Sequence, residues 1–118
     1  MDSLAELSHK LREFARARDW EKFHSPKNLA MAMIVEAAEL VEHFQWLTTE
    51  QSQTLDAAKL EQVRQEIGDV LIYLTRIADR LGIDLVAAAH DKMVINAAKY
   101  PAELARGNAA KSTEYGKP

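Results

Sequence analysis

Hydrophobic residues recur at helical spacing along most of the chain, and no stretch alternates as a strand would. The first helical series is Leu4, Leu7, Leu11 and Phe14. Intervals of three and four residues place these side chains on one face of a helix. Ser3, followed three residues later by Glu6, forms a capping-box signal for a helix start. We therefore predict a first helix over residues 3–18.

The second helix is predicted from a proline start signal. Ser25 precedes Pro26, and proline suits the first helical position because its φ is already helical and it has no amide to leave unpaired. The apolar pattern then continues to Leu47. Residues 48–54 are polar and form a connector, in which Thr48 and Gln51 fit a second capping box.

Two more helices follow the connector. Asp56 can cap a third helix, whose seam is heptad-like and ends at Gly82, a residue suited to a left-handed cap. Asp84 can cap a fourth helix that runs to Lys99, before a tyrosine-proline pair disfavours continuation. The seam of the third helix is Leu60, Val63, Ile67, Val70, Leu74, Ile77 and Leu81.

These four elements predict an all-α fold, a four-helix bundle or a close relative of it. We expect one domain over residues 1–106 and a flexible tail over residues 107–118, where the chain becomes rich in small and polar residues. Leu71, Ile72 and Ala78 extend the apolar surface of the third helix beyond its seam. A single short chain can hardly cover so wide a stripe, so we expect a homodimer or homotetramer.

Composition narrows the class of protein. A chain of 118 residues with 47% hydrophobic and 28% charged residues is typical of one globular domain. The formal charge of −3 gives no general attraction to nucleic acid or to an anionic membrane. The absence of cysteine excludes disulfides and thiolate metal sites. With no long apolar run either, a cytoplasmic protein that binds neither nucleic acid nor membrane is expected.

Two acidic pairs carry the candidate chemistry. Glu36 and Glu39 lie on the second predicted helix, and Glu66 and Asp69 lie on the third. Spacing of i, i+3 puts both carboxylates of a pair on one side of a helix, beside the apolar seam in both cases. Four carboxylates between packed helices repel one another unless a cation neutralises them. Their all-oxygen ligands favour Mg²⁺, with Mn²⁺ as an alternative, and Mg²⁺ commonly shares its coordination with phosphates.

Other interpretations of these pairs remain open. A single Glu-x-x-Glu pair is common on solvated helix faces, and it is the repetition on consecutive helices that favours a metal. A di-iron carboxylate bundle uses Glu-x-x-His, and neither pair ends in histidine. His43 follows Glu39 by one turn and can support the ligands from behind, although a solvated or core histidine is the more ordinary interpretation.

Aromatic and basic residues supply candidate nucleotide contacts. Trp20, Trp46 and Tyr73 can stack on a nucleobase, although tryptophan more often fills a core. Lys92, Asn96 and Lys99 form a polar stripe at i, i+4, i+7 that can bind a triphosphate, or that is simply a solvated face. No glycine-rich phosphate loop is present, so phosphate binding would depend on metal and side chains.

In combination, these motifs resemble the MazG-like, all-α nucleoside triphosphate pyrophosphatase superfamily, and most of all its dCTP pyrophosphatase branch. The resemblance covers residues 10–106. It rests on Arg18-Asp19-Trp20, Phe23-His24-x-Pro26, Glu36-x-x-Glu39-Leu40, Phe44-Gln45-Trp46, Glu66-x-x-Asp69-Val70-Leu71-Ile72-Tyr73-Leu74 and Lys92-Met93-x-x-Asn96-x-x-Lys99-Tyr100-Pro101.

The resemblance implies hydrolysis of a nucleoside triphosphate, with dCTP or a related or modified dNTP as substrate, to the monophosphate and pyrophosphate. By analogy, Mg²⁺ is held by Glu36, Glu39, Glu66 and Asp69, and Glu36 or Glu39 positions or deprotonates the attacking water. The same analogy places Trp20, Trp46 and Tyr73 around the base and assigns Lys92, Asn96 and Lys99 to the phosphates. The rival hypothesis is a non-catalytic helical interaction module that uses the acidic cluster only to bind a cation.

Overall fold

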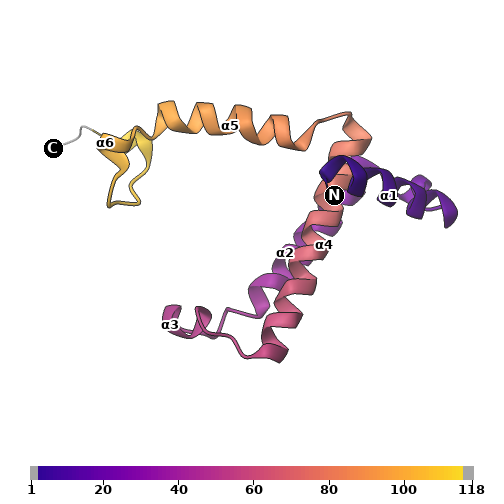
Figure 1. The fold of residues 1–118 in the computed structure, drawn as a ribbon, viewed down its shortest axis with the longest axis horizontal. Helices are drawn as coiled ribbons and strands as arrows, with labels where there is room; N and C mark the ends of the chain where they lie inside the picture. Colours follow the sequence, from indigo (N-terminus) through magenta and orange to yellow (C-terminus); the bar gives the residue numbers. More distant parts are fainter. Residues whose placement is uncertain (1–2, 116–118) are drawn as a thin grey trace. The chain divides into compact units, whose positions relative to one another are not determined.

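The computed structural model describes residues 3–115, which form helices and turns and contain no strand. The chain divides into two compact units, Met1–Ile83 and Asp84–Pro118. The all-α prediction is confirmed. No helix within the described residues has the length and apolar character needed to cross a membrane. In chain order the elements are α1 (Leu4–Ala17), the 3-10 helix η1 (Glu21–Phe23), α2 (Pro26–Glu42), α3 (Thr49–Ser52), α4 (Ala57–Leu81), α5 (Leu85–Lys99), α6 (Ala102–Ala105) and η2 (Ser112–Glu114) (Figure 1).

The helices begin at the predicted caps. In each case the cap side chain accepts a hydrogen bond from the backbone N–H three residues later, which satisfies one of the free amides of the first turn. Gly82 ends α4 with a φ of 68°, a left-handed conformation that glycine adopts without a Cβ clash. The residues that cap the helices in this way are Ser3, Ser25, Thr48, Asp56 and Asp84.

The second helix is shorter than predicted, because α2 ends at Glu42 and not at Leu47. Beyond Glu42 the backbone hydrogen bonds tighten: the amides of His43, Phe44 and Leu47 each bond to the carbonyl three residues earlier, at 2.9–3.2 Å. Such bonds form turns that do not continue the α-helix. Phe44, Gln45 and Trp46 therefore lie in a turn after the helix.

The core of the first unit lies along α4, which packs against both α2 and α1. Figure 1 shows α2 and α4 side by side. The buried hydrophobic residues of this core are few and come from all three helices: Ala15, Leu29, Val63 and Ala78. This packing of α2 on α4 is what positions the acidic pairs.

Apolar residues also form stripes on the outer faces of the two long helices. One stripe on α2 consists of exposed side chains at helical spacing, Met31, Ile34, Val35 and Val41. A second stripe on α4 consists of Leu60, Ile67, Leu71, Leu74 and Leu81. Large apolar side chains that repeat along one face, and that the other helices of the same unit do not cover, are typical of surfaces that meet another surface.

The second unit consists of α5 and the segment that follows it. The Tyr115 ring packs edge-on against Tyr100, with centroids 5.9 Å apart, and η2 precedes that contact. Residues 116–118 of the expected tail lie outside the described residues, and the flexibility of the tail stays a prediction. So does the assembly of α5 with the helices of the first unit into a four-helix bundle.

Candidate metal and nucleotide site

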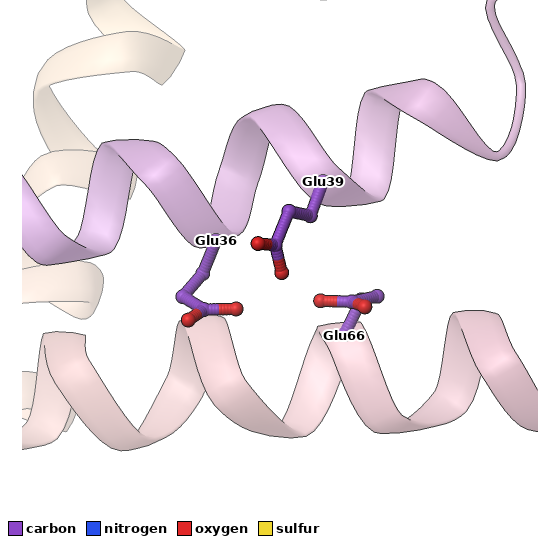
Figure 2. A group of neighbouring side chains, drawn as sticks. All are labelled: Glu36, Glu39 and Glu66. Atoms are coloured by element: carbon purple, nitrogen blue, oxygen red, sulfur yellow. The ribbon is translucent and has the colours of Figure 1, made fainter.

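Three carboxylates converge between α2 and α4. Glu36 and Glu39 project from α2 and Glu66 from α4, with one oxygen of each within 4.8 Å of the others (Figure 2). Their convergence follows from the i, i+3 spacing on α2 and from the packing of α4 on the same face. Within residues 3–115 this is the one group of three or more acidic or histidine side chains close enough to share an ion.

The carboxylates of this group lack the partners that buried charges require. Oε2 of Glu36 and Oε2 of Glu66 are both buried, and neither has a hydrogen-bond partner. Burial first, then interaction with Glu39 and the negative charges of Asp69 and Glu66, raise the pKa of Glu36 from 4.5 to about 7. Desolvation and like charge both disfavour ionisation, so it costs free energy to ionise all three carboxylates without a cation.

A hard dication fits these residues. Two unpartnered buried oxygens in a group of three carboxylates are acceptors without donors, and a cation bound there would satisfy both atoms. Carboxylate oxygens with no nitrogen or sulfur ligand in the group are typical of Mg²⁺, Mn²⁺ or Ca²⁺ sites.

Asp69, the fourth predicted ligand, lies outside the group of three. It follows Glu66 by one turn of α4, and its side chain is one methylene shorter than that of glutamate. Its negative charge nevertheless helps to raise the pKa of Glu36. Asp69 is therefore an electrostatic neighbour of the group, and its role as a ligand stays a prediction.

The three predicted base-binding aromatics have different surroundings. Trp46 is 87% exposed in the turn after α2, so its indole is free to stack on a ligand. Trp20 packs edge-on against Phe14 with centroids 5.8 Å apart and remains 43% exposed. Tyr73 is half-buried on α4. A shared base-binding role for these three residues stays a prediction.

A local conformation at the end of α1 positions Trp20. Asp19 has a φ of 54°, in the left-handed region, and the Trp20 amide bonds to the carbonyl of Ala15 at 2.9 Å. This bond closes the helix end in the manner of a Schellman cap. The reversal of the chain brings the indole back onto Phe14 and beside His24, whose pKa is lowered by burial and by the charges of Arg76 and Arg80.

The predicted phosphate-binding residues belong to the second unit. Lys92, Asn96 and Lys99 are all exposed on α5, which is compatible with phosphate binding and with a solvated face alike. Their role stays a prediction.

The chain is similar in sequence to one known family and to proteins of known name. The family model described as MazG-like matches residues 31–115. Human dCTP pyrophosphatase 1 is 45% identical over 104 residues, which cover 86% of this chain and 61% of the human protein. Rat dCTP pyrophosphatase 1 is 42% identical over the same shares of each chain. The chain thus spans about three fifths of the length of these relatives.

A solved structure is also similar. The crystal structure of a pyrophosphatase from Archaeoglobus fulgidus matches with a TM-score of 0.74 and 41% sequence identity. The match covers 86% of this chain and 94% of the archaeal chain. Likeness of this extent, in fold and in sequence together, is more than a shared helical architecture would give.

Proposed function

The chain belongs to the MazG-like family, and we propose that it is a nucleoside triphosphate pyrophosphohydrolase. The proposed substrate is dCTP, or a related or modified deoxynucleoside triphosphate, and the products are the monophosphate and pyrophosphate. The observation that carries the proposal is the convergence of Glu36, Glu39 and Glu66, with two buried oxygens that lack partners. The names of the human and archaeal relatives support the reaction class.

The proposed cofactor is Mg²⁺, with Mn²⁺ as an alternative, held by Glu36, Glu39 and Glu66, and we propose Asp69 as the fourth ligand. A magnesium ion in such a site neutralises phosphate charge and lowers the pKa of a bound water. Glu36 or Glu39 would orient the attacking water or accept its proton. In the metal-free chain the pKa of Glu36 is raised to about 7, and a bound cation would favour the ionised carboxylate that such a role requires.

The nucleotide itself would be bound by residues outside the acidic group. We assign base stacking to Trp20, Trp46 and Tyr73 and phosphate contacts to Lys92, Asn96 and Lys99. The 87% exposure of Trp46 supports the first assignment, because an indole that contributes almost nothing to the core of the single chain is available to a base. The exposed basic stripe on α5 supports the second.

We further propose that the working protein is a dimer or tetramer, in which residues 1–106 of each subunit form one catalytic domain. The apolar stripes on α2 and α4 support assembly, since the other helices of the first unit do not cover them.

A hydrolysis assay with product analysis tests the proposal. Purified protein with dCTP and Mg²⁺ should release dCMP and pyrophosphate, with no free orthophosphate. Glu39→Gln and Asp69→Asn should each lose at least about a hundredfold in rate, as expected when a strong electrostatic element is removed. Glu61→Gln, an exposed carboxylate on the same helix as Asp69, serves as the matched control and should retain wild-type turnover.

The result also separates the proposal from the rival hypothesis of a cation-binding interaction module. Such a module would gain thermal stability from Mg²⁺ alone and would be indifferent to the triphosphate. Wild-type turnover in Glu39→Gln and Asp69→Asn would reject the assigned site, and stabilisation by Mg²⁺ without any hydrolysis of a triphosphate panel would favour the module.

A further inference from the structure

His43 lies beside the acidic group, at the end of α2. It is the C-cap residue of that helix, and its side chain is 17% exposed, so it is neither a solvated histidine nor a fully buried one. One turn separates it from Glu39, which places both side chains on the same face of α2. Its ring therefore projects toward α4.

Lys59, on the first turn of α4, contacts one nitrogen of that ring. Its Nζ lies 3.3 Å from Nδ1 of His43. An ammonium group can only donate hydrogen bonds, so a hydrogen bond in this contact requires Nδ1 to be the acceptor. In the neutral imidazole the proton then belongs to Nε2, because each tautomer protonates one nitrogen only.

The other ring nitrogen faces a carboxylate of the acidic group. Nε2 of His43 lies 3.8 Å from Oε1 of Glu66. This separation exceeds a hydrogen bond, but it places a donor N–H beside one oxygen of the carboxylate. The second oxygen, Oε2, is buried and has no partner. The two oxygens of Glu66 therefore have different surroundings: Oε1 faces the imidazole, and Oε2 has no partner and can bind a ligand.

The helical repeat explains why these contacts occur together. Lys59 and Glu66 are seven residues apart on α4, two turns along one face. His43 bridges that interval from α2, with Lys59 on one side of its ring and Glu66 on the other. The three residues therefore link the start of α4, the end of α2 and the acidic group.

We infer that His43, held in its Nε2–H tautomer by Lys59, is a positioning residue that orients the Glu66 carboxylate for a divalent cation. The inference rests on the proposed function, since it takes the acidic group to be a metal site. Groups that orient a metal ligand from behind commonly contribute a factor of about 10–100 to metal affinity. Neither His43 nor Lys59 contacts the ion in this role.

The tautomer is tested without metal. Imidazole ¹⁵N spectra of the metal-free full chain should show the His43 Nδ1 unprotonated and Nε2 protonated. Lys59→Met should shift this signature toward the other tautomer or a mixture, whereas Lys10→Met, on α1, should leave it unchanged. A wild-type His43 that carries its proton on Nδ1 would overturn the inference.

The positioning role is tested by calorimetric titration with Mg²⁺ alone. His43→Leu should weaken binding by about tenfold. His43→Gln should restore most of the affinity, because its amide keeps an N–H near the place of Nε2, and a purely structural contribution would not predict that rescue. Circular dichroism of both variants checks that the fold is retained.

The outcomes separate this inference from the proposed function. Mg²⁺ binding by His43→Leu equal to that of the wild type would overturn the positioning role and leave the proposed function intact. Equal weakening in His43→Leu and His43→Gln would also overturn it. A wild-type chain that neither binds Mg²⁺ nor releases pyrophosphate would overturn both.

Discussion

At the scale of single residues, the Glu36 carboxyl determines how the site responds to pH. Its pKa of about 7 reflects burial and the neighbouring carboxylates in the metal-free chain. A cation bound among these groups would favour the ionised form and lower that pKa. Metal binding and proton release by Glu36 are therefore linked.

We predict that Mg²⁺ affinity depends on pH through this proton. Below about pH 7 the ion must displace a proton from Glu36, so the affinity should fall by about tenfold for each pH unit. Calorimetry in buffers of different ionisation enthalpy measures the protons released, which should approach one per site near pH 6 and decline toward zero near pH 8. An affinity that is constant across this range would contradict the assignment of Glu36.

The same group should affect the stability of the metal-free chain. Because the folded pKa is raised above the ordinary 4.5, the folded state holds the proton more tightly than the unfolded state does between pH 4.5 and about 7. Stability attributable to Glu36 therefore falls as pH rises through that window. Denaturant unfolding of the wild type and of Glu36→Gln should show this decrease in the wild type alone.

At the scale of elements, a partly buried ion-pair cluster joins α1 to α4. Arg12 of α1 donates to Asp79 of α4 through Nε at 3.1 Å, and Nη1 of Arg76 donates to the same carboxylate at 2.9 Å. The Arg76 side chain is only 3% exposed. The hydrogen bond from Arg12 is the main reason that the pKa of Asp79 is lowered.

We predict that Asp79→Asn lowers the free energy of unfolding by about 3 kcal/mol, because the buried Arg76 would lose its only charge partner in the described residues. Glu61→Gln breaks an exposed pair with Arg64 and should change the same quantity by less than about 0.5 kcal/mol. Urea unfolding followed by circular dichroism measures both values. Equal stability of the two variants would contradict the structural role of the cluster.

The sequence predicts where the helices start better than it predicts where α2 ends. Capping signals are local, so the starts of α1, α2, α4 and α5 were predicted from neighbouring residues alone. The end of α2 has no glycine or proline, and the helix gives way to tight turns after Glu42. The bridge from Lys59 through His43 to Glu66 depends on how α4 lies against α2, which the spacing within one helix does not fix.

At the scale of the whole molecule, the main feature is the pair of apolar stripes on α2 and α4, which the other helices of the first unit do not cover. Ile34 is 62% exposed and Ile67 is 54% exposed, although both belong to helices that also contribute to the core. Helix periodicity within the sequence was enough to identify the two acidic pairs. The proposed assembly would cover these stripes with a partner surface, which the sequence indicates only through an excess of apolar positions.

We predict that the protein sediments as a dimer or tetramer and that Ile34→Lys shifts it toward the monomer. A lysine in the middle of the α2 stripe would place a charge in a desolvated interface. His9→Lys adds the same side chain at an exposed position of α1 outside either stripe and should leave the assembly unchanged. Sedimentation velocity over a range of concentrations distinguishes the two, and a monomeric wild type at all concentrations would contradict the proposed assembly.

The proposed function depends on the acidic group being a cation site, and the most direct test of that site is Mg²⁺ binding to the nucleotide-free protein in wild type and in Glu66→Gln. Saturable binding is expected in the wild type, and it should be lost or weakened by at least about tenfold in Glu66→Gln. Binding should be unchanged in Glu61→Gln, an equivalent substitution on the exposed surface of the same helix. Equal Mg²⁺ affinity in the wild type and Glu66→Gln would contradict the proposed cation site.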